Sequence, residues 1–219
     1  MFNDDKYMPL RKIFGFIFVL LPVFAFAQVR GIDVSKYQGN IGWKRVAASG
    51  KVAYVYVKAT EGTTIQDPMY AANIKNARES GLPVGSYHLY SSKTSAYDQF
   101  SNFKKLVKKS EQDLIPMLDI EERYSNGLNL ERVDKILELM EREYGAKPLI
   151  YTSEHVYFDH FATKKYEDYQ IFIANYHYFP KCRFTLWQFS QTGTVPGISG
   201  YVDLSELSSK HKLEDIMMP

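Results

Sequence analysis

The sequence predicts an α/β fold, an irregular and shortened TIM-like barrel with about five βα units followed by three further strands. Over the first two thirds of the chain, short segments rich in β-branched and aromatic residues alternate with amphipathic segments, as in βαβ units around a parallel sheet. In the last third, strand-like segments follow one another closely. The 192 residues that remain after a predicted export signal are also fewer than the about 250 of a regular eight-fold barrel.

Eight segments have the length and composition of β-strands, with turn residues between them. They are Val29–Val34, Val52–Ala59, Val84–Leu89, Ile115–Ile120, Pro148–Thr152, Gln170–Asn175, Thr185–Phe189 and Gly200–Leu204.

Four segments between the early strands are expected to be helices. The pair Asp67-Pro68 predicts the start of the second, with Asp67 as its N-cap. In the fourth, Val133, Ile136 and Met140 fall on one face. The expected helices are Ile41–Ser49, Pro68–Ser80, Ser95–Lys109 and Leu130–Tyr144.

The last three strand candidates are joined by short connections, with nine residues between Asn175 and Thr185 and ten between Phe189 and Gly200. A parallel crossover with its helix needs at least about 10–12 residues. We therefore expect hairpin-like loops rather than helices in this part of the chain.

The N-terminal residues resemble a secretory signal peptide. Residues 13–27 form an apolar run of 15 residues, shorter than the about 20 of a membrane span, and the run ends in Ala25-Phe26-Ala27. We expect cleavage after Ala27, which makes residues 1–27 a signal peptide and residues 28–219 a single domain with no stable membrane span. The protein would then be exported, to the periplasm or out of the cell. An uncleaved N-terminal anchor is the alternative.

Composition excludes several classes of function. After cleavage the chain carries 24 basic and 23 acidic residues, so it offers no electrostatic attraction for nucleic acid or an anionic membrane surface. Its single cysteine, Cys182, cannot form an internal disulfide. No phosphate loop, dinucleotide fingerprint or metal-ligand spacing is present, so we expect no cofactor and no metal. We expect a monomer.

Acidic residues recur where strand candidates end. They are Asp33, Glu61, Asp119, Glu121 and Asp203. In a parallel barrel the C-terminal strand ends form one face, and that face carries the active site. Each residue taken alone could be an ordinary solvated loop acid, but the set predicts an acidic cleft.

Asp119 and Glu121 are the most informative pair. Residues i and i+2 of a strand point to the same face, so these carboxylates would project together beyond Leu118. Two carboxylates on one face are the basic equipment of glycoside hydrolysis.

Aromatic residues gather at the same strand ends. Tyr37, Tyr87, Tyr151, Tyr176 and Trp187 could stack on sugar rings and bind hydroxyl groups, or they could simply pack in the barrel wall.

Together these motifs resemble glycoside hydrolase family 25, the Chalaropsis-type lysozymes, in six blocks that occur in order over nearly all of residues 28–219. The blocks are Gly31-Ile32-Asp33-Val34-Ser35-Lys36-Tyr37-Gln38-Gly39, Lys58-Ala59-Thr60-Glu61-Gly62 with Asp67-Pro68, Gly81-Leu82-Pro83-Val84-Gly85-Ser86-Tyr87-His88, Leu118-Asp119-Ile120-Glu121, Trp187-Gln188, and Gly197-Ile198-Ser199-Gly200-Tyr201-Val202-Asp203-Leu204.

The resemblance implies an N-acetylmuramidase that cleaves the β-1,4 bond between N-acetylmuramic acid and N-acetylglucosamine in peptidoglycan strands, without a cofactor. It implies Glu121 as general acid/base, with Asp119, Asp33 and Asp203 completing the acidic site. The sugar cleft would be lined by Tyr87, Tyr151, Glu61 and Gln188. From their place at the strand ends, we expect Tyr176 and Trp187 to contribute to the same cleft.

Two positions depart from the family pattern. Phe172-Ile173-Ala174 replaces the usual Trp-x-Ala block, which could alter a sugar subsite, and Asp203-Leu204-Ser205 replaces Asp-x-Asn. Two other functions stay open: a catalytically weak peptidoglycan-binding module, and a glycosidase of the chitinase or endo-N-acetylglucosaminidase type.

The stereochemical route is also open. Direct attack by Asp119 requires carboxyl groups about 5–5.5 Å apart, whereas residues i and i+2 of a strand lie about 6.5–7 Å apart. This favours attack by the substrate's own 2-acetamido group, with Asp119 orienting it.

Overall fold

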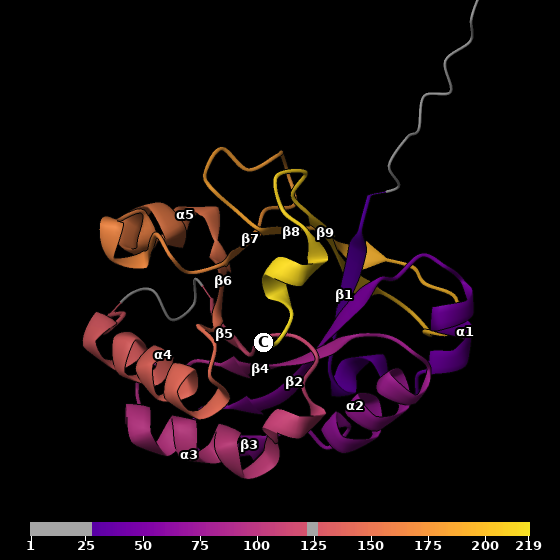
Figure 1. Cartoon of the computed structure of the whole chain (residues 1–219), viewed down its shortest axis with the longest axis horizontal. Helices are drawn as coiled ribbons and strands as arrows, with labels where there is room; N and C mark the ends of the chain where they lie inside the picture. The colour runs from indigo at the N-terminus through magenta and orange to yellow at the C-terminus, as the bar shows by residue number, and fades with distance from the viewer. Residues whose placement is uncertain (1–27, 122–126) are drawn as a thin grey trace, which may run out of the picture.

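The computed structural model describes residues 28–121 and 127–219, and the predicted signal peptide lies outside these residues. A nine-stranded sheet runs in the order β1-β9-β8-β7-β6-β5-β4-β2-β3, and an additional pairing of β1 with β2 closes eight of the strands into a barrel (Figure 1). The strands are β1 (Arg30–Val34), β2 (Tyr54–Glu61), β3 (Ile65–Gln66), β4 (Val84–Leu89), β5 (Met117–Ile120), β6 (Leu149–Ser153), β7 (Ile171–Ala174), β8 (Leu186–Gly193) and β9 (Val202–Leu207).

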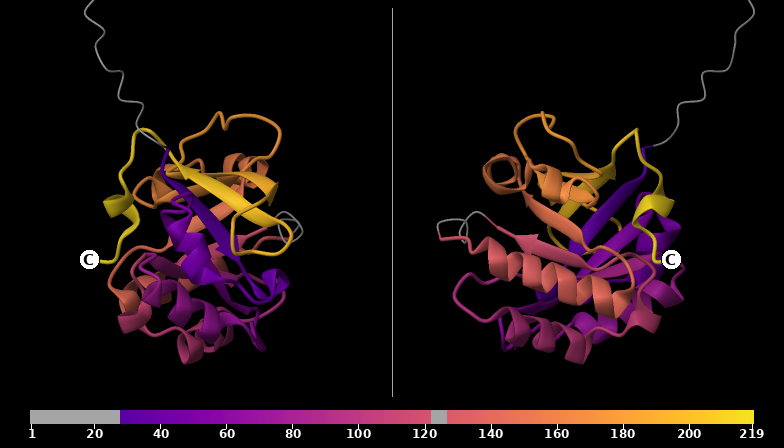
Figure 2. Two further views of the ribbon diagram at one scale, coloured as in Figure 1. Left: turned by 90° about the vertical axis from the view of Figure 1, so that its right-hand side faces the viewer. Right: turned by 60° about the vertical axis from the view of Figure 1, so that its left-hand side comes forward.

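Five βα units precede the last strands, as the sequence predicts. The helices are α1 (Trp43–Ala48), α2 (Tyr70–Glu79), α3 (Ala96–Leu106), α4 (Leu130–Tyr144) and the short α5 (Glu154–Val156), which continues into a π-helical turn over Tyr157–Phe161. Among the described residues, no α-helix follows β8 or β9 along the chain (Figure 2).

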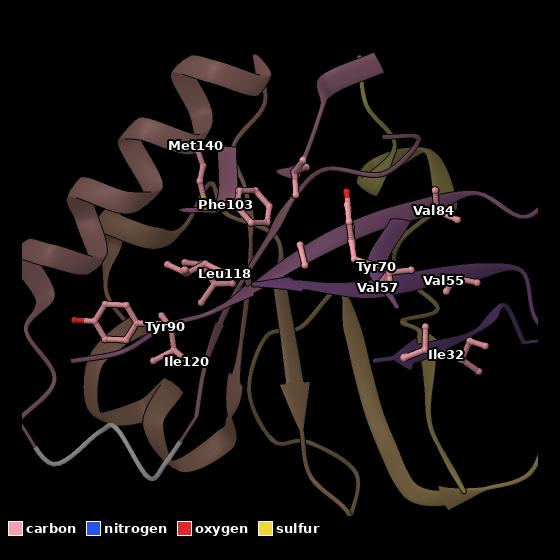
Figure 3. Packing of buried hydrophobic residues seen from close by; sticks show 14 of the residues in the cluster. Ile32, Val55, Val57, Tyr70, Val84, Tyr90, Phe103, Leu118, Ile120 and Met140 are labelled. Atoms are coloured by element: carbon pink, nitrogen blue, oxygen red, sulfur yellow. The ribbon is translucent and has the colours of Figure 1, made fainter. Parts of the chain in front are cut away.

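Two apolar layers hold the barrel. The outer layer lies between strands and helices and joins residues such as Val55, Leu118 and Ile120 to Phe103 of α3 and Met140 of α4 (Figure 3). The alternate strand residues form a second cluster, to which no residue of α1–α5 contributes. In a closed barrel this second cluster fills the interior. It contains Tyr54, Tyr56, Met117, Leu149, Phe172, Leu186 and Leu207.

The C-terminal segment closes the barrel at the N-terminal ends of the strands. Ile216 is fully buried in the interior cluster, and its carbonyl accepts a hydrogen bond of 2.9 Å from the amide of Ile115. Met217 forms a β-bridge with Leu114. Because this end is plugged, the opposite end is the open one, and all five candidate carboxylates lie at the C-terminal ends of β1, β2 and β5 or at the start of the antiparallel β9.

One expectation about the late strands is wrong. β8 and β9 do form an antiparallel hairpin, but β7 and β8 pair in parallel, so the chain between them crosses over without a helix. The length of a connection sets only whether a helix fits, and a plain loop of this length spans a parallel crossover as well.

Two further details differ. β3 and α5 are too short to have been recognised from periodicity. Asp67 caps the turn before α2 rather than α2 itself, since its two carboxylate oxygens accept from the amides of Met69 and Lys36, each at 2.9 Å. Within the described ranges, no helix has the length and apolar character needed to cross a membrane.

Candidate active site

Asp33 and Asp203 face each other at the open end of the barrel. They are direct partners in the antiparallel pairing of β1 with β9. Asp33 is 6 % exposed and Asp203 is half-buried. Two carboxylates brought together by strand pairing, one of them nearly without solvent, form a strongly acidic corner of the barrel mouth.

Asp119 and Glu121 reach the same mouth from β5. Asp119 lies between Leu89 of β4 and Tyr151 of β6 in the sheet, on the face of β5 that carries Met117 into the interior cluster. Asp119 is buried, whereas Glu121, just past the strand end, is partly exposed. The alternation of β5 therefore points the Asp119 carboxylate inward and the neighbouring Leu118 and Ile120 outward, as the sequence predicts.

A cleft of about 350 Å³ opens beside Glu121. It is walled by the ends of β6 and β7 and by the segment that follows β7. The residues that line it are Glu121, Tyr151, Ser153, Glu154, His155, Ala174, Asn175, Tyr176, His177 and Tyr178. This mixture of aromatic rings and polar groups suits a sugar ring, which presents apolar faces and hydroxyl edges.

Gln188 joins the acidic corner to the aromatic side of the cleft. Its Nε2 donates to Asp33 Oδ2 at 2.8 Å. Its Oε1 accepts from the hydroxyl of Tyr151 at 2.8 Å and from that of Tyr176 at 2.6 Å. Two hydroxyl donors on Oε1 fix the orientation of the amide, so that its nitrogen must face Asp33.

The acidic corner favours protonated carboxyl groups. Burial raises the pKa of Asp33 well above its ordinary value, the charge of Asp203 raises it further, and the hydrogen bond from Gln188 opposes both. Burial, with the charge of Glu121 second, raises the pKa of Asp203 to about 6. Asp33 Oδ1 is buried and has no hydrogen-bond partner within the described part of the chain, which adds to the cost of ionising this carboxyl group.

The tyrosines of the mouth stay neutral. Burial raises the pKa of Tyr87 and of Tyr151 well above the ordinary value, and the charges of Asp119 and Asp33 act in the same direction on both. Burial raises the pKa of Tyr176 to about 12. All three hydroxyl groups therefore stay protonated near the carboxylates, and those of Tyr151 and Tyr176 donate their single hydrogen to Gln188.

Two of the expected residues have partners other than the hydrogen-bonded group of Asp33, Gln188, Tyr151 and Tyr176. Glu61 forms an ion pair of 2.8 Å with Lys58 of its own strand. Trp187 alternates with the inward Gln188 and points to the outside of β8, where its ring packs against Phe179 and its Nε1 donates to the carbonyl of Asn175 at 2.8 Å.

Both departures from the family pattern lie inside the barrel. Phe172 is fully buried and packs edge-on against the ring of Tyr151, with centroids 5.1 Å apart. Ser205 is fully buried, and its hydroxyl lies 3.0 Å from that of Tyr54. Phe172 therefore supports Tyr151 from below rather than facing the cleft.

Two residues that the sequence did not single out also line the cleft. Glu154 and Asn175 are buried and bonded to each other, with 2.9 Å between Asn175 Nδ2 and Glu154 Oε2. Asn175 stands at the end of a strand candidate, as the predicted site carboxylates do. It was not predicted because the pattern at the strand ends consists of acidic and aromatic residues, and an amide belongs to neither class.

The described residues contain no group of three or more His, Cys, Asp or Glu arranged to hold a metal ion. His88 points out of the barrel into the layer beneath α3, where its ring nitrogens bond Thr60 Oγ1 at 2.7 Å and Gln99 Oε1 at 3.2 Å. Its role there is to satisfy buried polar groups.

Comparison with known proteins supports the same conclusion as the geometry. The model of the family "Glycosyl hydrolases family 25" matches residues 32–198. The chain is 34 % identical to the Escherichia coli K12 protein YegX over 189 residues, covering 81 % of this chain and 68 % of YegX. It is 31 % identical to lysozyme M1 of Streptomyces globisporus over 206 residues, covering 82 % and 68 % of the two chains.

A solved family 25 glycosyl hydrolase from Bacillus anthracis superposes with a TM-score of 0.75 at 28 % identity, over 86 % of this chain and 91 % of that one. Sequence family, barrel topology and the acidic mouth agree, and this chain is a glycoside hydrolase that belongs to glycosyl hydrolase family 25.

Proposed function

We propose that this enzyme is a peptidoglycan hydrolase of the lysozyme type, which cleaves the β-1,4 bond between N-acetylmuramic acid and N-acetylglucosamine. The observation that carries the proposal is the meeting of Asp33, Asp119 and Asp203 with the more exposed Glu121 at one barrel mouth, beside an aromatic cleft. The similarity to lysozyme M1 supports the choice of substrate.

The differences in burial suggest how the roles divide. Glu121 is the partly exposed member and lines the cleft, so it can approach the glycosidic oxygen as general acid and later activate water as general base. Asp119 is buried on the same side of β5 and would orient the 2-acetamido group of the substrate as that group attacks the anomeric carbon.

Asp203, with a pKa of about 6, is ionised at neutral pH and would complete the site around the developing positive charge of the sugar, with Asp33 beside it. Electrostatic stabilisation of a charge that develops only in the transition state is a large contribution to catalysis in a site shielded from water. Gln188 holds Asp33 in place. The neutral hydroxyl group of Tyr87 can pair with sugar hydroxyl groups, and those of Tyr151 and Tyr176, which already donate to Gln188, can accept from them.

The test uses purified peptidoglycan and the release of reducing ends. Glu121→Gln keeps the shape of the side chain and removes its ability to transfer a proton, so we expect a loss of at least about 10²-fold in rate. Asp119→Asn should also be strongly impaired. A Glu121→Gln variant that works at nearly the wild-type rate would reject the assignment, and an inactive wild-type chain that still binds sacculi would indicate a binding module.

We also propose that residues 1–27 direct export and are removed after Ala27, so that residues 28–219 act as a single monomeric domain in the periplasm or outside the cell. N-terminal sequencing of the exported protein should begin at Gln28. A mature protein that still begins at Met1 and sediments with membranes would indicate an uncleaved anchor.

A further inference from the structure

Glu154 is a buried carboxylate at the cleft for which the proposed chemistry has no use. It is the first residue of α5 and is 7 % exposed. Oε2 accepts from Asn175 Nδ2 at 2.9 Å, and Oε1 accepts from the backbone amide of Lys181. One side chain thus holds both ends of the segment 175–181, which follows β7 and forms one wall of the cleft.

Asn175 extends this clamp through the rest of its polar atoms. Its Oδ1 accepts from the amides of His177 at 3.1 Å and Tyr178 at 3.3 Å. Its own amide donates to the carbonyl of Gln188 at 3.1 Å, and its carbonyl accepts from Trp187 Nε1 at 2.8 Å. The turn that begins at Asn175 is therefore fixed to both α5 and β8.

Tyr176 is the residue that this arrangement presents to the cleft. It lies between the two clamped ends, is 39 % exposed, and donates its hydroxyl to Gln188 Oε1 at 2.6 Å. Gln188 in turn holds Asp33. The position of the 175–181 segment thus decides both the wall of the cleft and one of the two hydroxyl groups that orient Gln188.

We propose that Glu154 is a positioning residue that pre-forms a sugar subsite on the β7 side of Glu121, with Tyr176 as the ring that contacts the N-acetylated pyranose. This inference rests on the proposed function. Both oxygens of Glu154 already accept hydrogen bonds from the segment that they hold, so Glu154 acts through Tyr176 and does not transfer protons to substrate.

The physical reason is that the buried carboxylate of Glu154 ties the two ends of the 175–181 segment together, so that neither end can move without leaving a charged oxygen unpaired. If the segment moved away, Glu154 would lose two donors while remaining largely desolvated, which is unfavourable for an ionised group. A wall held in its binding conformation avoids the entropic cost of ordering it when the glycan binds. Loosening it lowers the fraction of molecules ready to bind and raises the apparent dissociation constant by the same factor.

Glu154→Gln is the conservative variant. The Gln amide nitrogen cannot accept a hydrogen bond, and Asn175 cannot turn its oxygen toward it without releasing His177 and Tyr178, so one of the two clamp bonds must be lost. In the full chain we expect apparent KM for peptidoglycan to rise by about 5- to 10-fold with kcat within about 2-fold. Hydrogen exchange should accelerate in the 175–181 segment and stay unchanged in α4.

Two further variants make the test specific. Glu138→Gln removes an equally charged side chain from the outer face of α4 and should leave KM unchanged. Tyr176→Ala keeps the clamp bonds and removes the ring that contacts the sugar, so it should itself raise KM. In the Tyr176→Ala background Glu154→Gln should add less than it does in the wild-type chain, because both act through one contact.

The outcomes separate the two proposals. A wild-type chain that releases no reducing ends overturns the proposed function. With an active wild type, unchanged KM in either Glu154→Gln or Tyr176→Ala overturns the subsite. A fall in kcat alone in Glu154→Gln shows that Glu154 takes part in the chemistry, and fully additive effects show that the two residues act separately.

Discussion

Replacing Asp203 by Asn should make the protein more stable at neutral pH while impairing its activity. Burial, with the charge of Glu121 second, raises the pKa of Asp203 from an ordinary 3.8 to about 6. The folded protein therefore holds a proton more tightly than the unfolded chain does. The free energy of unfolding must then fall as pH rises from about 4 to 6, and the full loss is present above pH 6.

The size of the effect follows from the shift. About two pKa units correspond to about 3 kcal/mol, an upper value because Asp203 keeps some contact with solvent. Asn resembles the protonated carboxyl group in shape and carries no charge. Asp203→Asn should therefore match the wild type at pH 3 and exceed it by up to about 3 kcal/mol at pH 8.

Urea unfolding at both pH values measures this difference directly. The exposed Asp168, which pairs with Lys147 on the surface, provides the matched control, and Asp168→Asn should show no comparable gain at pH 8. If Asp203→Asn is no more stable than the wild type at pH 8, the electrostatic cost assigned to the acidic corner is wrong.

Three further outcomes are expected. Gln188→Leu removes the donor to Asp33 and the acceptor of two tyrosine hydroxyl groups, so kcat/KM for peptidoglycan should fall by about 10- to 100-fold. An activity close to wild type would show that these three hydrogen bonds of Gln188 are dispensable. Burial lowers the pKa of His88 from 6.5 to about 4, so the free energy of unfolding of the wild type should fall by up to about 3 kcal/mol as pH falls between these values. In urea unfolding, the free energy of unfolding of His88→Gln should depend less on pH over this range, and equal slopes for the two proteins would contradict the assignment. A Cβ at Gly31 would lie 2.0 Å from a ring carbon of buried Tyr54, so Gly31→Ala should lower stability by about 1–3 kcal/mol in thermal melts, and an unchanged midpoint would mean that the ring has room to move.

Much of the fold was predictable because local pattern and tertiary packing agree. β4 and α4 match their expected bounds to the residue, since alternation and 3.6-residue spacing there coincide with burial on one face. The direction of β8 relative to β7 was not predictable, because the length of a connection does not encode the sense of pairing.

The carboxylates of the site were predictable for a different reason. The strand ends of a barrel meet at one mouth, so acids placed there converge whatever the details of packing. The side of the sheet on which each residue of β8 lies was harder to predict. Gln188 points into the barrel and Trp187 out of it, and this depends on the register of β8 against β9. The hydrogen bonds of Glu154 to the 175–181 segment join residues that are more than 20 positions apart, and no local sequence pattern predicts such contacts.

The most direct measurement of the central claim is mass spectrometry of the fragments that the wild-type enzyme releases from purified peptidoglycan. The proposed cleavage leaves N-acetylmuramic acid at every new reducing end, and Glu121→Gln should release none above background. Reducing ends of N-acetylglucosamine would contradict the account, as would muramic acid ends released equally by wild type and Glu121→Gln.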